Sequence, residues 1–217
     1  TNTFGKVTYS TTYTKSDVEG WLWISCPFDA TITVKVGTTN ISLTYAGDPK
    51  ENYKHACYLL NSFSSKIRAE KGTDYWVAQK TNTLKAGEGY ILGIDPRSLT
   101  GNITVTYTSI NSRNENKGSH EVTLAENISN YNNCSNQHLI GTGLYYSTDY
   151  FSGNILTNNP CYVAIPPISN SNTPNWKYII TNNNTVYTLE PFKAYFFQFN
   201  GYISMGRSYE VAKAPMA

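Results

Sequence analysis

The chain has 217 residues, enough to bury a hydrophobic core as one large β-sandwich or as two smaller β domains. Its formal net charge of +2 comes from scattered Lys and Arg without a basic run, so we expect no nucleic-acid partner. No apolar stretch approaches the roughly 20 residues that a spanning helix needs, so we expect no membrane insertion by this chain.

The choice of residues favours strands over helices. There are 18 Tyr, 8 Phe and 4 Trp, whereas charged residues make up only 15% of the chain. Aromatic and β-branched side chains fit the half-buried surface of a pleated sheet. Long helices need more Ala, Leu, Glu and Lys than this chain offers. The composition therefore predicts an all-β fold with little helix, in which polar loops join the strands.

Short apolar runs between turn residues predict the strands of the first half, at residues 4–13, 21–26, 31–36, 41–45, 56–60, 75–78, 89–94 and 103–107. Residues 37–40, which begin with Gly37, separate two of these runs and predict a hairpin. The run at residues 21–26 is dense in apolar side chains, which is typical of a strand buried on both faces. Within it Trp21 and Trp23 share a face, and we expect both in the core.

A polar stretch at residues 111–118 follows and predicts a linker or a long loop. After it, the same pattern predicts strands at residues 121–124, 138–141, 162–165, 177–181, 185–189 and 194–199. Helical turns are expected only near residues 48–55 and 125–131. Many short strands with frequent turns are typical of a sandwich or a barrel.

An internal repeat is visible in the two halves. Residues 84–92 align without gaps on residues 189–197, and both segments begin with Leu and end with Tyr and two hydrophobic residues. Chance similarity between strands is the alternative, but the alignment favours duplication. We therefore expect two related β-sandwich-like units, an N-terminal one at residues 1–110 and a C-terminal one at residues 119–217. Whether they are separate domains or one continuous sandwich stays open.

The repeat also predicts which residues face the cores. Strands at residues 89–94 and 194–199 are expected to be central and to occupy equivalent places in their halves. Side chains two positions apart on a strand share a face. We therefore expect Tyr90 and Leu92 to point into one core, and Tyr195 and Phe197 to point into the other.

Four segments resemble the repeated β modules of large secreted or surface proteins of Bacteroidetes. Residues 19–29 resemble their Gly-Trp-aromatic-x-Ile-Ser-Phe-Pro-Phe-Asp opening, and residues 84–92 resemble their Leu-Lys-Ala-Gly-x-Gly-Tyr-Ile-Phe closing. In the second half, residues 137–141 resemble the Trp-Asn-Leu-Val-Gly opening of a partner module. Residues 189–198 resemble its Leu-x-Pro-Phe-x-Ala-Phe-Phe-Val-Gln closing. The second opening departs from the family, because residues 142–145 are Thr-Gly-Leu-Tyr where Asn-Pro-Tyr-Pro is usual.

The resemblance implies an extracellular or cell-surface location, often beside leucine-rich repeats or other adhesive modules. It implies no reaction and supplies no catalytic residues. We therefore expect a non-catalytic module with a structural or adhesive role in a larger protein. Its expected partners are neighbouring domains or a surface protein.

Catalytic and metal-binding patterns are scarce. The three histidines, His55, His120 and His138, have no neighbours at metal-ligand spacing. Neither a nucleophile elbow nor a phosphate-cradling glycine loop is present. A glycosidase needs two carboxylates at a defined separation, and the sequence does not show that any two converge. We predict that the chain is not an enzyme and has no catalytic residue, metal site or cofactor.

Carbohydrate binding is the alternative function, because flat aromatic faces stack on sugar rings. Where two aromatic residues are adjacent on a strand, one of them should face solvent. Packing in the core or on a sheet is the competing role for these side chains. The candidate ligand-binding residues are Tyr75, Trp76, Tyr145, Tyr146, Tyr150 and Trp176.

The four cysteines are Cys26, Cys57, Cys134 and Cys161. Four cysteines allow three full pairings, among which a sequence cannot choose. Three of them sit among apolar or aromatic neighbours, which suits small buried hydrophobic residues. We expect thiols, with disulfides as the alternative in an oxidising compartment.

Overall fold

The computed structural model describes residues 3–4, 6–14, 21–43, 57–62, 76–79, 81–94, 101–111, 113–114, 119–124, 137–145, 147–148, 150–152, 161–165, 175–181, 184–185, 188–198 and 201–206. This part of the chain is rich in strands and contains no helix, as the composition predicts. Both segments expected to form helical turns, residues 48–55 and 125–131, lie outside the described residues. Among the described ranges, no helix has the length and apolar character that a membrane crossing requires.

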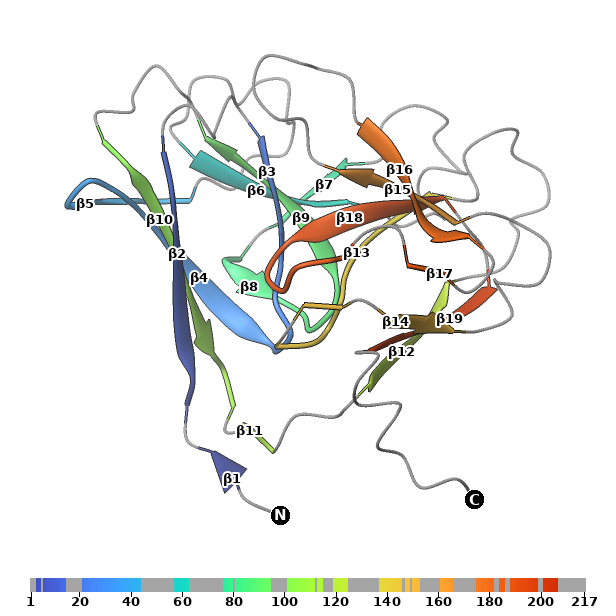
Figure 1. Cartoon of the computed structure of the whole chain (residues 1–217). Coiled ribbons are helices and arrows are strands. Elements are labelled where there is room, and N and C mark those ends of the chain that lie inside the picture. The colour runs from blue at the N-terminus through green and yellow to red at the C-terminus, as the bar shows by residue number, and fades with distance from the viewer. Residues whose placement is uncertain are drawn as a thin grey trace.

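Among the described residues, ten strands precede the predicted linker at residues 111–118 (Figure 1). They are β1 (Thr3–Phe4), β2 (Thr8–Tyr13), β3 (Trp21–Ser25), β4 (Ala30–Val36), β5 (Thr39–Ile41), β6 (Cys57–Ser62), β7 (Trp76–Ala78), β8 (Thr83–Leu84), β9 (Gly89–Ile94) and β10 (Ile103–Ser109). Nine more described strands follow, of which the first lies inside the predicted linker. They are β11 (Arg113–Asn114), β12 (Ser119–Leu124), β13 (Gln137–Gly141), β14 (Tyr150–Ser152), β15 (Cys161–Ile165), β16 (Asn175–Thr181), β17 (Asn184–Thr185), β18 (Ala194–Gln198) and β19 (Gly201–Gly206).

Two antiparallel sheets of the first half share one hydrophobic core. One sheet has the order β2-β10-β4-β5, with β8 beside β4, and the other has the order β3-β9-β6-β7. On β4 and β10 buried residues alternate with more exposed ones, because successive side chains of a strand point to opposite faces. The core side chains from these two strands and from β3 and β9 are Leu22, Ile24, Ala30, Ile32, Val34, Val36, Tyr90, Leu92, Ile103, Val105 and Tyr107.

The predicted hairpin joins β4 to β5 through the two residues Gly37 and Thr38. Val36 pairs with Thr39 at the base of the loop, and Gly37 has a φ of 59°. A positive φ in a two-residue loop matches the twist of the flanking strands, and glycine adopts it without a steric cost. The strand after the turn ends at Ile41, earlier than the sequence indicates.

Strand β9 is buried on both faces, whereas β3 is buried on one face and carries the partly buried Trp23 on the other, and the side chain of Trp21 lies outside the described residues. One face carries Leu22 and Ile24 into the first core. The opposite face of this sheet places Ile91 against Leu139 and Ala194 of the second half, with a half-buried Trp23 packed beside them. In Figure 1, β3 and β9 accordingly lie between the β2-β10-β4 sheet and the strands β13 and β18.

The second half has the same order of strands. Its five-stranded sheet has the order β13-β18-β15-β16-β17, and the first four of these strands correspond to β3-β9-β6-β7. Its three-stranded sheet has the order β12-β19-β14, which corresponds to β2-β10-β4. Strands β9 and β18 are both flanked on two sides, so the expectation of two central strands at equivalent places is confirmed.

The residues predicted to point into the cores are buried wherever their side chains are described. Tyr90, Leu92 and Tyr195 are each buried, whereas the side chain of Phe197 lies outside the described residues. Two segments differ from the sequence prediction. Within residues 111–118 a short strand, β11, pairs with β1. In the expected strand at residues 185–189, Thr185 belongs to β17, Thr188 belongs to no strand and Leu189 forms a bridge with Thr148, whereas residues 186–187 lie outside the described residues.

Candidate functional site

The closing segment of each half meets the opening strand of the other half. The amide of Ser25 in β3 donates a hydrogen bond to the carbonyl of Phe192 at 3.2 Å. The amide of Gly141 in β13 donates one to the carbonyl of Gly87 at 2.9 Å. In the aligned repeat Phe192 is the counterpart of Gly87, and the pairing of β3 with β9 and of β13 with β18 makes Ser25 the counterpart of Gly141. The two hydrogen bonds are therefore reciprocal, and we call this contact the junction.

Backbone bridges extend the junction by one residue on each side. Ile24 bridges Lys193, and Glu88 bridges Ile140, again in reciprocal positions. The backbones of β3 and β13 approach each other closely here. A Cβ added to Gly141 would lie 1.8 Å from the Oγ of Ser25, so only glycine fits at this position.

A buried tyrosine fixes each closing segment. The hydroxyl of Tyr90 accepts a hydrogen bond from the amide of Lys85 at 2.9 Å, and that of Tyr195 accepts one from the amide of Glu190 at 2.9 Å. The Tyr90 hydroxyl also donates to the Glu88 carboxylate at 2.9 Å. Burial is the main cause that raises the pKa of Tyr90 above its ordinary value, because the phenolate would lose its hydration.

Phe192 differs from its counterpart because its side chain enters the core of the other half. Its ring stacks on Tyr9, with ring centroids 3.8 Å apart and planes 9° from parallel. Tyr107 and Phe28 surround it, at centroid distances of 5.1 and 6.0 Å. The backbone of Phe192 has a φ of 60°, a left-handed conformation that costs an L-residue about 1–2 kcal/mol. The aromatic packing offsets this cost, since such conformations persist only where the surroundings hold them.

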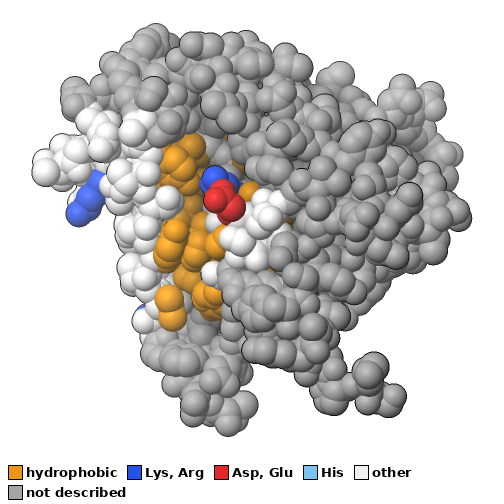
Figure 2. All heavy atoms as spheres, viewed as in Figure 1, with side chains coloured by type: hydrophobic (Ala, Val, Ile, Leu, Met, Phe, Trp, Pro, Cys, Tyr) orange, Lys and Arg blue, Asp and Glu red, His pale blue; other side chains and the backbone are white. Residues whose placement is uncertain are grey.

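Figure 2 shows a hydrophobic strip on a hollowed face beside β2. Tyr13 and Tyr145 are partly buried and pack against the first core, and Tyr9, which is 41% exposed, stacks on Phe192. Tyr145 joins this group through Phe28, whose ring stacks on it at a centroid distance of 5.8 Å. We call Tyr9, Tyr13, Tyr145 and Phe192 the aromatic hollow.

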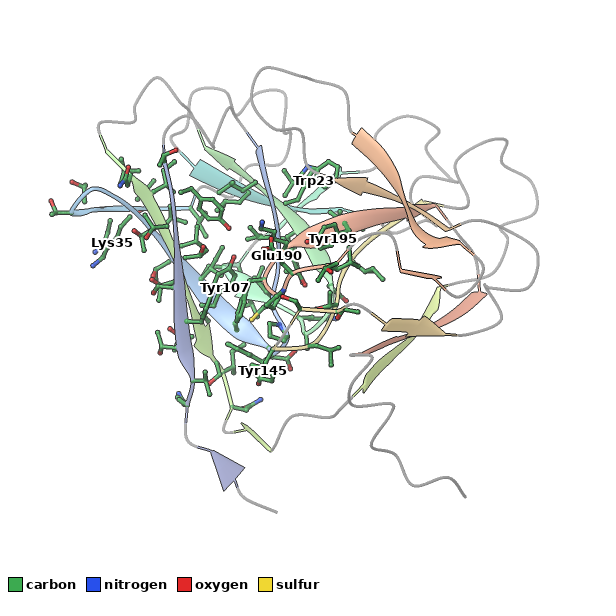
Figure 3. The ribbon with its side chains drawn as sticks, in the orientation of Figure 1. Trp23, Lys35, Tyr107, Tyr145, Glu190 and Tyr195 are labelled. Carbon is green, nitrogen blue, oxygen red and sulfur yellow. The ribbon has the colours of Figure 1, made fainter. Side chains whose placement is uncertain are left out.

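A pair of opposite charges lies at the aromatic hollow. Lys193 donates a hydrogen bond to the carboxylate of Glu190, and both side chains are about half exposed. Figure 2 shows an acidic and a basic side chain together in the hollowed region, and Figure 3 places Glu190 between Tyr107 and Tyr195. The pKa of Tyr13 is raised, first by burial and then by the nearby Tyr9 and Glu190, while a hydrogen bond from Thr11 works in the opposite direction.

The face of the β2-β10-β4-β5 sheet that points away from the core carries different side chains. On it the hydroxyls of Ser10 and Thr106 are hydrogen-bonded at 2.8 Å, and those of Thr12 and Thr104 at 3.1 Å. The exposed Lys35 of β4 lies on this face as well. These side chains offer hydroxyl groups and a charge but no flat ring, so a ligand that needs stacking would be held at the aromatic hollow instead.

The structure places the predicted ligand-binding residues at several locations. Tyr145 lies in the aromatic hollow, half-buried against Phe28. Trp76, Tyr150 and Trp176 belong to β7, β14 and β16, which are in three different sheets, and their side chains lie outside the described part. Tyr75 and Tyr146 lie outside the described residues altogether.

Sequence reasoning missed Tyr9, Tyr13 and Phe192 as candidate site residues. The alternation in residues 4–13 does put Tyr9 and Tyr13 on one face, but it does not show that a ring from the second half packs against that face. The difference between Phe192 and Gly87 in otherwise similar closing segments was the available signal.

Acidic and metal-binding side chains in the described residues have structural contacts. Asp29 accepts a hydrogen bond from the amide of Ala86 at 2.9 Å, and Glu88 accepts the one from Tyr90. No group of three His, Cys, Asp or Glu side chains within the described ranges could hold a metal ion. Cys26 is buried and carries a thiol. Cys134 and the side chains of Cys57 and Cys161 lie outside the described part.

Among the described residues, the aromatic hollow and the junction are two of the places where residues from both halves come together, beside the cluster of Ile91, Leu139 and Ala194. One combines flat rings with an ion pair, and the other joins backbone to backbone. No family model, no curated protein and no solved structure matches this chain.

Proposed function

We propose that the chain is a non-catalytic module with a structural or adhesive role in a larger secreted or cell-surface protein. We also infer that it consists of two related β-sandwich-like units, at residues 1–110 and 119–217, which residues 111–118 connect. The matching order of strands and the equivalent closing segments support the relation between the units.

The observation that carries the proposal is the pair of reciprocal hydrogen bonds at the junction, from Ser25 to Phe192 and from Gly141 to Gly87. A buried backbone amide that loses its partner is left unsatisfied, at a cost of roughly 1–3 kcal/mol. Separating the halves would break both bonds and expose Ile91 and Leu139 to water as well. The two units therefore move as one body, which is the property that a spacer or an adhesive platform needs.

Location and partners follow from the resemblance to the Bacteroidetes modules. Those modules occur in secreted or surface proteins, beside leucine-rich repeats or adhesive domains. We accordingly propose an extracellular or cell-surface location, with neighbouring domains or a surface protein as partners. Protease treatment of intact source cells tests the location, because an exposed module is cleaved without lysis and an internal one is not.

Pulling the chain by its two ends in an optical trap tests the mechanical part of the proposal. We expect both halves to unfold together in one event, since the junction links them. Beads coated with the chain should also adhere to surfaces presenting its partner proteins under flow. Two separate unfolding events at different forces would contradict the rigid body. Turnover of glycoside, ester or peptide substrates would contradict the non-catalytic role.

Carbohydrate binding is the second candidate function, and the aromatic hollow favours it. Tyr9 retains 41% of its surface exposed although one face of its ring is covered by Phe192. Sugar-binding sites combine such rings with a few polar groups that fix the orientation of the ligand. Glu190 and Lys193 supply such groups here. A glycan array with the purified chain tests this function, and an array without any bound glycan would exclude it.

A further inference from the structure

We propose that the aromatic hollow binds a neutral pyranose sugar, which stacks on the open face of Tyr9 and hydrogen-bonds to Glu190 and Lys193. This inference rests on the second candidate function and gives it a site and a class of ligand. It places the stacking contact at Tyr9, which is not among the candidate residues that the sequence indicates.

Tyr9 provides the flat surface. Phe192 stacks on its ring in a nearly parallel arrangement, and Tyr9 still keeps 41% of its surface exposed. The covered face also fixes the ring, which therefore loses little conformational freedom when a ligand binds. A rigid ring that is open on one side suits the apolar C–H face of a pyranose.

Polar groups of the aromatic hollow come from two elements of the fold. On β2, Tyr13 adds a hydroxyl on the same face of the strand as Tyr9. On the closing segment of the second half, Glu190 is an acceptor and Lys193 is a donor. Sugar hydroxyls both donate and accept, so they can satisfy these groups together.

The charges select a neutral ligand. Glu190 and Lys193 neutralise each other, so the hollow has no net charge from this pair. A charged ligand therefore gains no net attraction from this pair that would offset the loss of its hydration. A polyhydroxylated neutral ring loses less hydration and can use both groups as hydrogen-bond partners. The occupant is therefore a neutral sugar rather than a uronate or a sulfated glycan.

The experiment titrates the full chain with four neutral hexasaccharides, of gluco-, xylo-, manno- and galacto-configuration, and with polygalacturonate and heparin as anionic probes. Calorimetry gives the affinity, and saturation-transfer NMR shows which sugar protons touch the protein. We expect at least one neutral hexasaccharide to bind and both anionic probes to bind at least about tenfold more weakly.

Four variants locate the site. Tyr9→Leu keeps apolar contact with Phe192 but removes the flat ring, and it should lower the affinity about tenfold or more. Tyr9→Phe keeps the ring and should retain binding within about threefold. Glu190→Gln, which alters an exposed side chain, should weaken binding several-fold. Ile110→Ala is the matched control, because Ile110 is the other large hydrophobic side chain that is exposed among the described residues, at 38%.

Three outcomes would overturn the proposal. The first is the absence of binding by all four neutral hexasaccharides at millimolar concentration. The second is unchanged affinity in both Tyr9→Leu and Glu190→Gln, together with loss of binding in Trp76→Ala or Trp176→Ala. The third is tighter binding of an anionic probe than of every neutral one. Each outcome leaves the structural or adhesive role standing, because that role is tested by mechanical unfolding and by bead adhesion.

Discussion

Gly87 and Phe192 occupy the same position in the two closing segments, and both have a left-handed backbone, with φ values of 76° and 60°. Each presents its carbonyl to the opening strand of the other half. Glycine adopts this conformation freely, whereas phenylalanine adopts it at a cost. The second half thus keeps the turn of the first and adds a side chain that reaches into the neighbouring core.

Exchanging Ser25 and Gly141 tests whether the junction is symmetric. Gly141→Ser alone should destabilise the chain by about 1–3 kcal/mol or more, because its Cβ would overlap the Oγ of Ser25. Adding Ser25→Gly moves the hydroxyl to the equivalent position and should recover at least half of the loss, as measured by urea denaturation. Gly89→Ala is the control, since its Cβ would meet the backbone carbonyl of Leu139 at 2.6 Å, which no side-chain change relieves. A double variant as unstable as Gly141→Ser would contradict the symmetry.

Three Tyr→Phe substitutions should differ in their cost to stability according to whether the lost hydroxyl is hydrogen-bonded. Tyr90→Phe and Tyr195→Phe each leave a backbone amide, of Lys85 or Glu190, without its acceptor and should cost about 1–3 kcal/mol. Tyr107→Phe should be neutral or stabilising, because its buried hydroxyl has no hydrogen-bond partner among the described residues. Melting temperatures measured under one condition check this order. A Tyr107→Phe variant that is the least stable of the three would show that its hydroxyl has a partner.

Alkaline pH should unfold the chain through its buried tyrosines. Burial raises the pKa of Tyr90 and Tyr107 above the ordinary value of 10.0. Above pH 10 the unfolded chain loses these protons while the folded chain keeps them, so stability is intact below pH 10 and falls as the pH rises further. Each such tyrosine contributes a slope of about 1.4 kcal/mol per pH unit. Urea midpoints at several pH values from 8 to 11 measure it, and Tyr107→Phe should make the decline shallower. An equal decline in that variant would argue against the role of Tyr107.

Phe192 should show opposing contributions from packing and strain. Phe192→Ala removes the ring but keeps a Cβ in the left-handed conformation, so we expect a loss of about 3–5 kcal/mol. Phe192→Gly removes the ring and the strain together and should be about 1 kcal/mol more stable than Phe192→Ala. Urea denaturation of the two variants measures the difference. If Phe192→Gly were the less stable variant, the backbone strain would be negligible.

Much of the first half could be predicted from the sequence, because its strands alternate clearly or are densely apolar. The repeat also identified Tyr90 and Tyr195 as equivalent buried residues. Strands β8, β11 and β17 have two residues each, which is too short for a periodic pattern. They are strands because partners elsewhere in the chain pair with them, and a single sequence does not show those partners.

The aromatic hollow could not be predicted, because it depends on how the halves meet. Tyr9 and Phe192 are far apart in the sequence, and no local pattern indicates that their rings stack. The aromatic doublets were predicted as binding candidates because adjacent rings on a strand face opposite sides of the sheet. That argument identifies exposed rings but not their neighbours, so it included Tyr145 and missed Tyr9.

Amide hydrogen exchange at Ser25 and Gly141 tests most directly whether the halves form one body. Both amides donate across the junction, so each should exchange only when the halves separate. The amide of Gly37, which bonds to Asn102 within the first half, is the internal reference. We predict that Ser25 and Gly141 exchange at equal free energies, within about 1 kcal/mol of the global unfolding free energy. Exchange of either amide at the rate of an exposed loop, while Gly37 stays protected, would contradict the account.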